Sequence, residues 1–311
     1  MVKDTVELKI GGELVNIEDI LSLSFNDCAG SKSDKVSLKV VPSFPRPAPN
    51  TKLELTFKSF VNDELKESLE CGLFHTQTVT RSNNKTLSFS ATGVEFNEKQ
   101  KEKLSNNYKD TKLSNIVDIV AKRLGHSVKF KTLDPTIKSL LQTNETDINF
   151  LERIAKQYNV TFSIKNDIIY FVNKDDETLP ETTINIEHCE SSSIKHTTKT
   201  YYQSCECSWH DVDQGKLLVV TYGDGTPCLK VKGAFKDDRD AKIKAQAKLL
   251  QANKGTVQGS FSNRGIALYA GTKVNVTGTY ESEDDGVYSV ESCTHTWSRS
   301  DGWVTDVEIQ N

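Results

Sequence analysis

Six histidines and seven cysteines are the side chains of this 311-residue sequence best suited to nucleophilic or metal chemistry. The densest group joins His188-Cys189 to the segment Cys205-x-Cys207-x-x-His210. Cys205 and Cys207 are two residues apart on a predicted strand and therefore share one face. Zinc needs four such ligands around one point, and this spacing matches no common zinc pattern. We predict no metal site and interpret the cysteines as reduced, small apolar residues, because their number is odd and no CxxC pair occurs.

The other reactive side chains suggest no catalytic arrangement. The sequence contains no G-x-S-x-G turn, no H-E-x-x-H helix and no phosphate-binding glycine loop. A lone histidine on a strand is usually packed or solvated, so we assign His295 a packing role beside Trp297. The run Glu283-Asp284-Asp285 lacks the spacing of an EF-hand and is interpreted as a solvated turn. We predict no catalytic residues and no cofactor, and therefore a protein that is not an enzyme.

Charge of both signs is mixed along the chain, with a formal net value of −4. This balance argues against a protein whose main role is to bind phosphate backbones, and no basic face for membranes is evident. No apolar run is long enough to span a bilayer, and the charged N-terminus does not resemble a secretory signal. We expect a protein that is made and kept in a cytosol, with no direct membrane insertion.

Alternating apolar and polar residues predict strands through the first third of the chain. A hairpin is expected at 7–15, where Gly11-Gly12 supplies the turn. The proline-rich stretch 42–49 is expected to be an extended connector. We interpret 1–97 as an N-terminal β-barrel domain. Its other predicted strands are 21–25, 36–40, 53–57, 74–80 and 86–91.

Two amphipathic helices are predicted in the middle of the chain. The first spans 111–125, and the second starts after Asn144 or Thr146, either of which can cap it. The second helix should end at Asn159, a residue type that tolerates the left-handed conformation. We interpret 98–177 as a small α/β domain. The short strands expected in it are 128–130, 160–164 and 168–172.

The last third of the chain returns to strands, interrupted by one helix. A hairpin is predicted from the strands 200–209 and 216–222. The alanine-containing segment from Asp237 to Gly255 is predicted to be a helix with acidic residues at its start. We interpret 178–311 as a second β-barrel domain that contains this helix.

A weak internal repeat links the two ends of the sequence. Thr51–Thr56 resembles Thr272–Thr277, and the copies are followed by Gly72-Leu73-Phe74 and Gly286-Val287-Tyr288. The alternative is chance similarity between threonine-rich strands. A true repeat would make the two ends copies of one β-barrel with an α/β domain inserted between them, an α+β fold that is mainly β. Three such chains would present six quasi-equivalent units around an axis.

The order of residues between Gln142 and Val172 carries a resemblance. It comprises a glutamine, an E-x-D helix start, the run F-L-x-R-I-A and an aromatic strand. This order resembles the central motif of the phage late control D family, the tail hub proteins of contractile phages. It is also similar to the hub part of type VI secretion spikes. The matching residues are Gln142, Glu145, Asp147, Phe150, Leu151, Arg153, Ile154 and Ala155.

The resemblance extends beyond this motif and has two mild departures. Thr146 and Ile154 stand where the family usually has serine and leucine. The stretch Thr272–Trp297 is similar to the family's C-terminal signature, whereas the N-terminal region matches least. The resemblance implies two tube-like antiparallel β-barrels flanking an inserted small α/β domain, and trimeric rings of such chains.

The functional expectation is a structural tail hub or baseplate protein of a contractile phage or phage-like particle. As a homotrimer it would adapt a six-fold tail tube to a three-fold spike. The expected partners are spike, tail tube, tape-measure and baseplate proteins, with DNA only passing through the lumen. Its location would be the tip of the virion tail, after assembly in the host cytoplasm. Since the sequence ends at its last strand, we expect the spike to be a separate protein.

A second hypothesis is a cell-wall carbohydrate-binding or hydrolytic tail-associated β protein. Such a protein requires an exposed aromatic platform or a pair of carboxylates in a cleft. Trp209, Trp297 and Trp303 are the large aromatic candidates for the platform.

Overall fold

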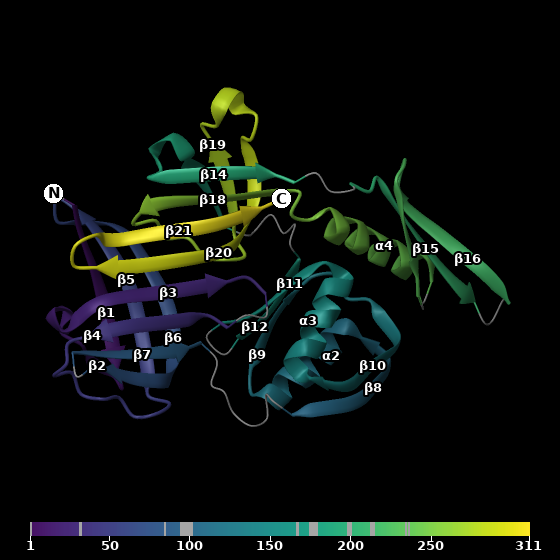
Figure 1. The fold of residues 1–311 in the computed structure, drawn as a ribbon. Helices are drawn as coiled ribbons and strands as arrows, with labels where there is room; N and C mark the ends of the chain where they lie inside the picture. Colours follow the sequence, from purple (N-terminus) through teal and green to yellow (C-terminus); the bar gives the residue numbers. More distant parts are fainter. Residues whose placement is uncertain are drawn as a thin grey trace.

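The computed structural model of the chain is built mainly of antiparallel strands, with three α-helices in the part that it describes (Figure 1). No helix of this part is both long enough and apolar enough to cross a membrane. The described residues are 2–30, 33–83, 85–93, 102–165, 168–173, 180–197, 201–211, 215–233, 235 and 237–311.

One large sheet joins the two ends of the sequence. Its strand order is β14-β18-β21-β20-β3-β4-β7-β6-β5-β1-β2, with β19 and β13 branching from β20. The N-terminal and C-terminal strands meet where β20 pairs antiparallel with β3. The strands are β1 (Val2–Ile10), β2 (Glu13–Leu14), β3 (Ile20–Cys28), β4 (Lys35–Val40), β5 (Lys52–Val61), β6 (Glu64–Ser82), β7 (Thr86–Thr92), β13 (Glu181–Asn185), β14 (Ser191–His196), β18 (Val257–Arg264), β19 (Lys273–Thr277), β20 (Gly286–Ser298) and β21 (Gly302–Gln310).

The two copies of the internal repeat have the same strand pairing. In the first copy β5 pairs with β6 in the register Leu53–Phe74, and in the second β19 pairs with β20 in the register Val274–Tyr288. Both long strands then bulge by one residue at corresponding positions as they turn to the next partner, β7 or β21. Strands β3, β4, β5, β6 and β7 therefore correspond to β14, β18, β19, β20 and β21.

The tight turns of the two copies also match. The Thr51 hydroxyl donates to the Ala48 carbonyl at 2.7 Å, and the Thr272 hydroxyl donates to the Tyr269 carbonyl at 2.6 Å. A short 3-10 helix precedes the first matching strand of each copy, η1 (Ile17–Asp19) and η2 (Ile186–His188). In both, an asparagine side chain caps the helix by accepting from the second helical N–H. This agreement in register and hydrogen bonding favours a true repeat over chance similarity, although β13 pairs parallel with β19 where β1 pairs antiparallel with β5.

An α/β unit follows the first copy of the repeat. It consists of β8 (Lys103–Lys112), α2 (Leu113–Leu124), β9 (Ser127–Lys131), β10 (Thr136–Thr146), α3 (Asp147–Tyr158), β11 (Val160–Lys165) and β12 (Ile168–Asn173). Both predicted helices and the three predicted strands are present. Thr146 rather than Asn144 caps α3, because its Oγ1 accepts from the Asn149 N–H at 3.3 Å, and Asn159 ends the helix with a φ of 51°. The long antiparallel pair of β8 and β10, which are separated in the chain by α2 and β9, was not predicted.

A third group of elements lies apart from the large sheet, at the right of Figure 1. The predicted hairpin is present as β15 (Ser204–Asp211) and β16 (Lys216–Gly223), and β17 (Cys228–Lys232) adds parallel to β15. The predicted helix is α4 (Asp238–Asn253), capped by Asp237, whose side chain accepts from the Asp240 N–H at 2.8 Å. The helix covers this three-stranded sheet, and its alanines pack on the strand cysteines.

His295 lies at the junction of the two copies and is 0% exposed. Its Nδ1 accepts from the indole N–H of Trp303 at 3.3 Å, and its Nε2 lies 3.0 Å from the Leu268 carbonyl. An indole nitrogen can only donate, so the ring is neutral with its proton on Nε2. The predicted packing role is confirmed, although the ring contacts are to Trp303, Phe25 and Phe57 rather than to Trp297. Burial lowers the pKa of His295 to about 4.

The chain should lose stability to acid through His295. Between about pH 6.5 and 4, His295 is protonated in the unfolded chain but stays neutral in the folded chain, because its pKa is lowered there. The histidine's stabilising contribution is therefore full above pH 6.5 and falls by on the order of 2–3 kcal/mol as the pH drops through this window. Denaturant unfolding across the window should show a smaller pH slope for His295→Gln than for the wild type. Equal slopes would contradict a neutral, buried imidazole.

Candidate functional site

The structure separates the cysteines and histidines that are clustered in the sequence. Cys205 and Cys207 are buried beneath α4, whereas His188 and Cys189 lie in and beside η2 of the large sheet. Burial raises the pKa of the Cys205 thiol to about 12, which leaves it unreactive. Within the described residues no group of three or more histidine, cysteine or acidic side chains could hold a metal ion.

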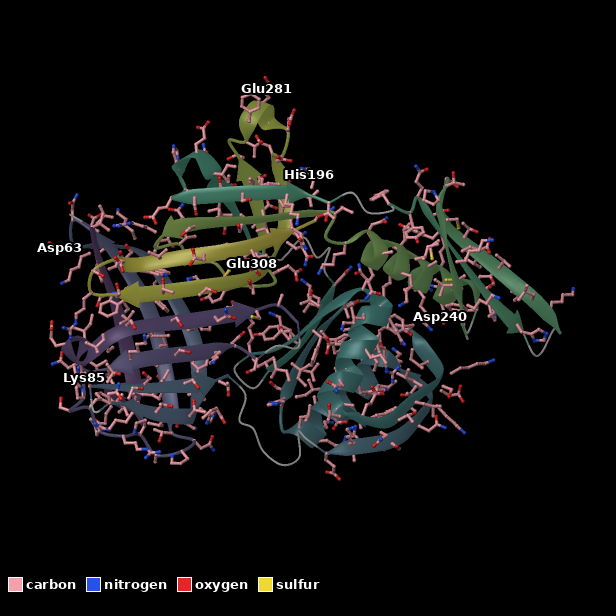
Figure 2. All side chains as sticks on the ribbon, viewed as in Figure 1. Asp63, Lys85, His196, Asp240, Glu281 and Glu308 are labelled. Atoms are coloured by element: carbon pink, nitrogen blue, oxygen red, sulfur yellow. The ribbon has the colours of Figure 1, made fainter. Side chains whose placement is uncertain are left out.

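The tryptophans do not form the platform that carbohydrate binding requires. Trp209, Trp297 and Trp303 are 6%, 4% and 0% exposed. The acidic run at 283–285 forms part of a turn, in which Asp285 accepts from the Thr279 N–H and hydroxyl. Glu281 lies at the outer tip of this turn, above His196 on β14 (Figure 2). The second hypothesis therefore loses its aromatic candidates.

One face of the large sheet is lined by small hydroxyl side chains, and we call it the hydroxyl face. It follows the eight strands β14-β18-β21-β20-β3-β4-β7-β6. Residues that pair directly across antiparallel strands point to the same side, so the register defines its members. They are Ser191, Ser193, Ser260, Ser262, Ser292, Thr294, Thr296, Ser298, Ser22, Ser24, Ser37, Ser88, Ser90, Thr78 and Thr80.

The sequence alternates along these strands, which is why the face is mostly polar, although Val304 of β21 also lies on it. In β3 the hydroxyls of Ser22 and Ser24 point to one side, and the buried Leu23 and Phe25 point to the other. One unbroken row of hydroxyls runs from Thr296 through Ser24, Ser37 and Ser90 to Thr78. At the end of the row the Ser90 and Thr78 hydroxyls are 2.7 Å apart. The local pattern was predicted, but its continuation from one copy to the other was not.

Charges of both signs occupy some of the remaining positions on this face. Glu308 accepts from the Ser292 hydroxyl at 2.7 Å, and most of the other charged groups point into solvent. The charged residues at these register positions are Lys35, Lys39, Lys195, Arg264, Asp306 and Glu308. The face thus combines small neutral hydroxyls with mixed charge, a surface that has no strong preference for an anionic polymer.

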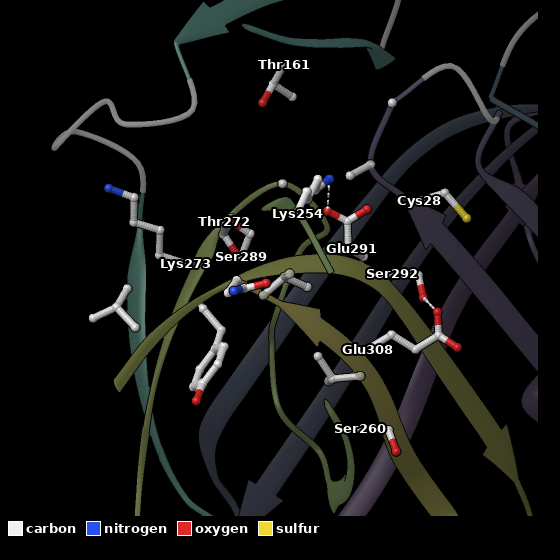
Figure 3. A pocket seen from close by; sticks show the side chains of 18 of the residues that line it. Cys28, Thr161, Lys254, Ser260, Thr272, Lys273, Ser289, Glu291, Ser292 and Glu308 are labelled. Carbon is white, nitrogen blue, oxygen red and sulfur yellow. Dashed lines mark hydrogen bonds and ion pairs between the residues drawn. The ribbon is translucent and has the colours of Figure 1, made fainter. Parts of the chain in front are cut away.

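A cleft of about 1160 Å³ opens where the hydroxyl face meets the α/β unit and α4. Figure 3 shows its lining side chains, which come from the large sheet and the neighbouring units. Lys254 and Glu291 form an ion pair across it at 2.7 Å. Thr161 of β11 lines its other side. The cleft is lined by both polar and apolar side chains, and the described residues around it form no grouping of nucleophile and base.

A buried ion cluster joins the α/β unit to the large sheet. The Lys165 ammonium at the end of β11 bonds to the carboxylate of Asp27 on β3, which is 0% exposed, and lies 3.8 Å from that of Asp34. The other Asp27 oxygen accepts from the Ala270 N–H at 2.8 Å, and Asp34 accepts from the Cys28 N–H at 3.2 Å. Nothing in the local sequence pattern marked this cluster.

Burial and the neighbouring charges shift the pKa values of Asp34 and Lys165. Burial raises the pKa of Asp34 to about 7, even though Lys165 pulls it down. Burial opposes the charge on Lys165, but the two carboxylates outweigh it and raise the pKa of the ammonium above its ordinary range. The lysine is therefore charged in the folded chain and neutralises at least Asp27 inside the junction.

The motif residues around α3 form hydrogen bonds and ion pairs that hold the start of this helix in place. Asp147 is buried and accepts from Gln142 at 2.8 Å and from Arg123 of α2 at 2.6 Å. Arg153 forms a two-pronged ion pair with Glu145, with distances of 2.6 and 3.2 Å. These bonds fix the start of α3 to β10 and to α2, so the motif orients elements of the α/β unit.

No protein-family model and no curated protein matches this sequence. Solved structures match it well. The 43 kDa tail protein of prophage MuSo2 from Shewanella oneidensis aligns with a TM-score of 0.71 at 13% identity, covering 99% of this chain and 98% of its own. A tail protein from Neisseria meningitidis MC58 aligns with a TM-score of 0.73 at 14% identity, covering 99% and 96%.

A secretion protein shares the fold as well. The E. coli c3393 protein, a component of the type VI secretion system with structural similarity to the T4 phage tail proteins gp27 and gp5, has a TM-score of 0.58 at 11% identity. The match covers 97% of this chain and 76% of that protein. The chain thus has the fold of phage tail and type VI secretion hub proteins, which confirms the resemblance and the mainly β fold class at the level of the fold.

Replacing Lys165 should destabilise the chain strongly. Lys165→Met leaves the buried Asp27 and Asp34 facing each other without a cation, a loss of about 3–5 kcal/mol for a broken buried pair. The matched control is Lys156→Met on the same unit, whose pair with Glu152 is partly exposed and contributes under about 1 kcal/mol. Urea unfolding of both variants measures the difference. Equal small losses of unfolding free energy in the two variants would contradict a stabilising ion cluster at the junction.

Asp34→Asn should stabilise the chain at neutral pH and not in acid. The raised pKa means that the folded chain holds a proton on Asp34 that the unfolded chain releases between about pH 4 and 7. Stability from this group is therefore present below pH 4 and is lost as the pH rises to 7. The unfolding free energy of the variant relative to wild type should grow by on the order of 4 kcal/mol across that window. A difference in unfolding free energy between variant and wild type that does not change with pH would count against a protonated Asp34.

Proposed function

We propose that this chain is a structural tail hub of a contractile phage or phage-like particle. Three copies form a ring that adapts a six-fold tail tube to a three-fold spike. One observation carries the proposal: the chain holds two copies of one strand arrangement, joined in a single sheet. A trimer of such chains has three-fold symmetry at its outside and six nearly equivalent units around its axis.

The regions 1–97 and 178–311 each hold a tube-like barrel that continues the tube wall, and β15–β17 with α4 form a separate part of the second region. The inserted α/β domain, 98–177, contacts the baseplate. The buried Lys165 cluster supports these separate roles, because it holds the α/β unit at a fixed position against β3. The function is mechanical, with no catalytic residue, cofactor or metal.

The hydroxyl face is proposed as the wall of the lumen. Hydroxyl groups hydrogen-bond to water as readily as to a passing polymer, and the mixed charges give no stripe of cations on which phosphates would be retained. DNA, where the particle carries it, passes without binding. The partners are the tube and tape-measure proteins on one side and the spike and baseplate proteins on the other, in the virion tail after assembly in the host cytoplasm.

The ring can be tested on the purified chain. Light scattering at high protein concentration should give the mass of three chains, and electron micrographs should show hollow rings with six similar lobes. Rings should co-purify with the tube protein and the spike protein encoded in the same genome. A monodisperse monomer that binds neither protein would contradict the hub, and release of peptidoglycan fragments by the pure chain would favour the enzyme hypothesis.

A further inference from the structure

Among the unpaired strand edges of the described part of the large sheet, two lie at the ends of the hydroxyl face. Strand β14 pairs with β18 on one side only. The last part of β6, from Thr78 to Ser82, pairs with β7 on one side only, because β5 stops pairing at His75. Neither edge contains a proline, and both are exposed. Exposed edges of this kind readily pair with another chain.

The internal repeat relates these two edges to the pair of β20 and β3, which is formed within the chain. Strand β14 is the copy of β3, and β6 is the copy of β20. Within the chain β20 and β3 pair with each other, and that pairing joins the two copies. Following the registers from strand to strand, Lys195 occupies the position of Asn26, and Thr80 occupies the position of Thr294.

The geometry points to a heterologous contact between copies of this chain, in which β14 of one copy pairs antiparallel with the end of β6 of the next. We infer the register from the internal junction, where Thr294 lies opposite Asn26 and the two side chains are hydrogen bonded at 3.0 Å. Thr80 therefore pairs with Lys195, Val79 with His196 and Arg81 with Ile194. This inference rests on the proposed ring and names the contact that closes it.

In this register, residues that belong to the same face of the sheet lie opposite each other across the contact. Thr80 and Lys195 both belong to the hydroxyl face, so that face continues from one chain to the next. A slip by one residue would set the half-buried Val79 opposite Lys195 and turn every side chain to the wrong face. Eight strands of each chain lie on this path, so a closed trimer has a barrel of 24 strands.

The directions of the backbone N–H and C=O groups on β14 agree with this pairing. The Ala29 N–H donates to the Glu291 carbonyl of β20 at 2.8 Å, so alternate residues of β3, Asp27 among them, direct their N–H and C=O groups to β20. His196 is the copy of Asp27. Its backbone groups therefore face the free edge, and the Thr197 N–H, one residue later, donates inward to Thr256 at 2.7 Å.

Disulfide trapping tests the register. The double variant Thr80→Cys with Lys195→Cys should form an intermolecular disulfide under mild oxidation, giving closed trimers on a non-reducing gel. The control is Thr80→Cys with Ser192→Cys, which puts the second thiol on the opposite face. Each single variant controls for the seven native cysteines. Dimers or trimers from the first pair alone support the register.

A proline at the edge tests the backbone contact independently. His196→Pro removes an N–H that faces outward and costs no bond to β18, whereas His196→Ala keeps that N–H and loses the same side chain. Both variants lose the ion pair with Asp284. The proline variant should lose ring mass in light scattering while its melting temperature matches that of the alanine variant. Equal ring formation by both would overturn the contact.

The outcomes separate this inference from the proposed hub. A trimer that forms without the Thr80–Lys195 disulfide, or with the control pair instead, overturns the register and leaves the ring intact. Disulfide ladders longer than three chains support the strand pairing and contradict the trimer. Monomers whose two cysteines stay free, as shown by maleimide labelling, overturn the pairing.

Discussion

The antiparallel pairing of β20 with β3 is the constraint on which the rest of this molecule depends. It brings residues that are more than 260 positions apart into one ladder and makes a single sheet from two copies of a repeated unit. Loop closure over such a distance is costly, so the pairing has to be strengthened by burial. His295, Trp303, Phe25 and Phe57 provide that burial directly behind the junction.

The junction also determines where the inserted α/β unit can lie. Asp27 belongs to β3, and its carboxylate is held on one side by the Ala270 N–H and on the other by Lys165. A buried carboxylate without a cation is costly, so the lysine must reach this point whenever the chain is folded. The same strand thus joins the two copies of the repeat and anchors the unit inserted between them.

Duplication inside one sheet explains why small hydroxyls occur on seven of the eight strands of this face. Each strand needs only to alternate small polar and large apolar residues, and the shared register aligns the polar set across both copies. A chain whose two halves are nearly equivalent can occupy six-fold positions in a three-fold assembly. This geometry accounts for a fold held in common with tail and secretion proteins at 11–14% identity, since register and alternation constrain residue class more than residue identity.

Local features of this protein were determined by the sequence alone. Gly125 and Asn159 end their helices, and the alternating strands of the repeat lie where the pattern predicted, because helix termination and alternation act over a few neighbouring residues. The choice of Thr146 over Asn144 as the cap of α3 came from the structure. The antiparallel pair of β8 and β10 was missed, as its strands are polar and alternate weakly. The burial of all three tryptophans, the Lys165 cluster and the β20–β3 ladder were decided only by the tertiary structure. Each depends on partners far apart in the chain, whose meeting no local pattern records.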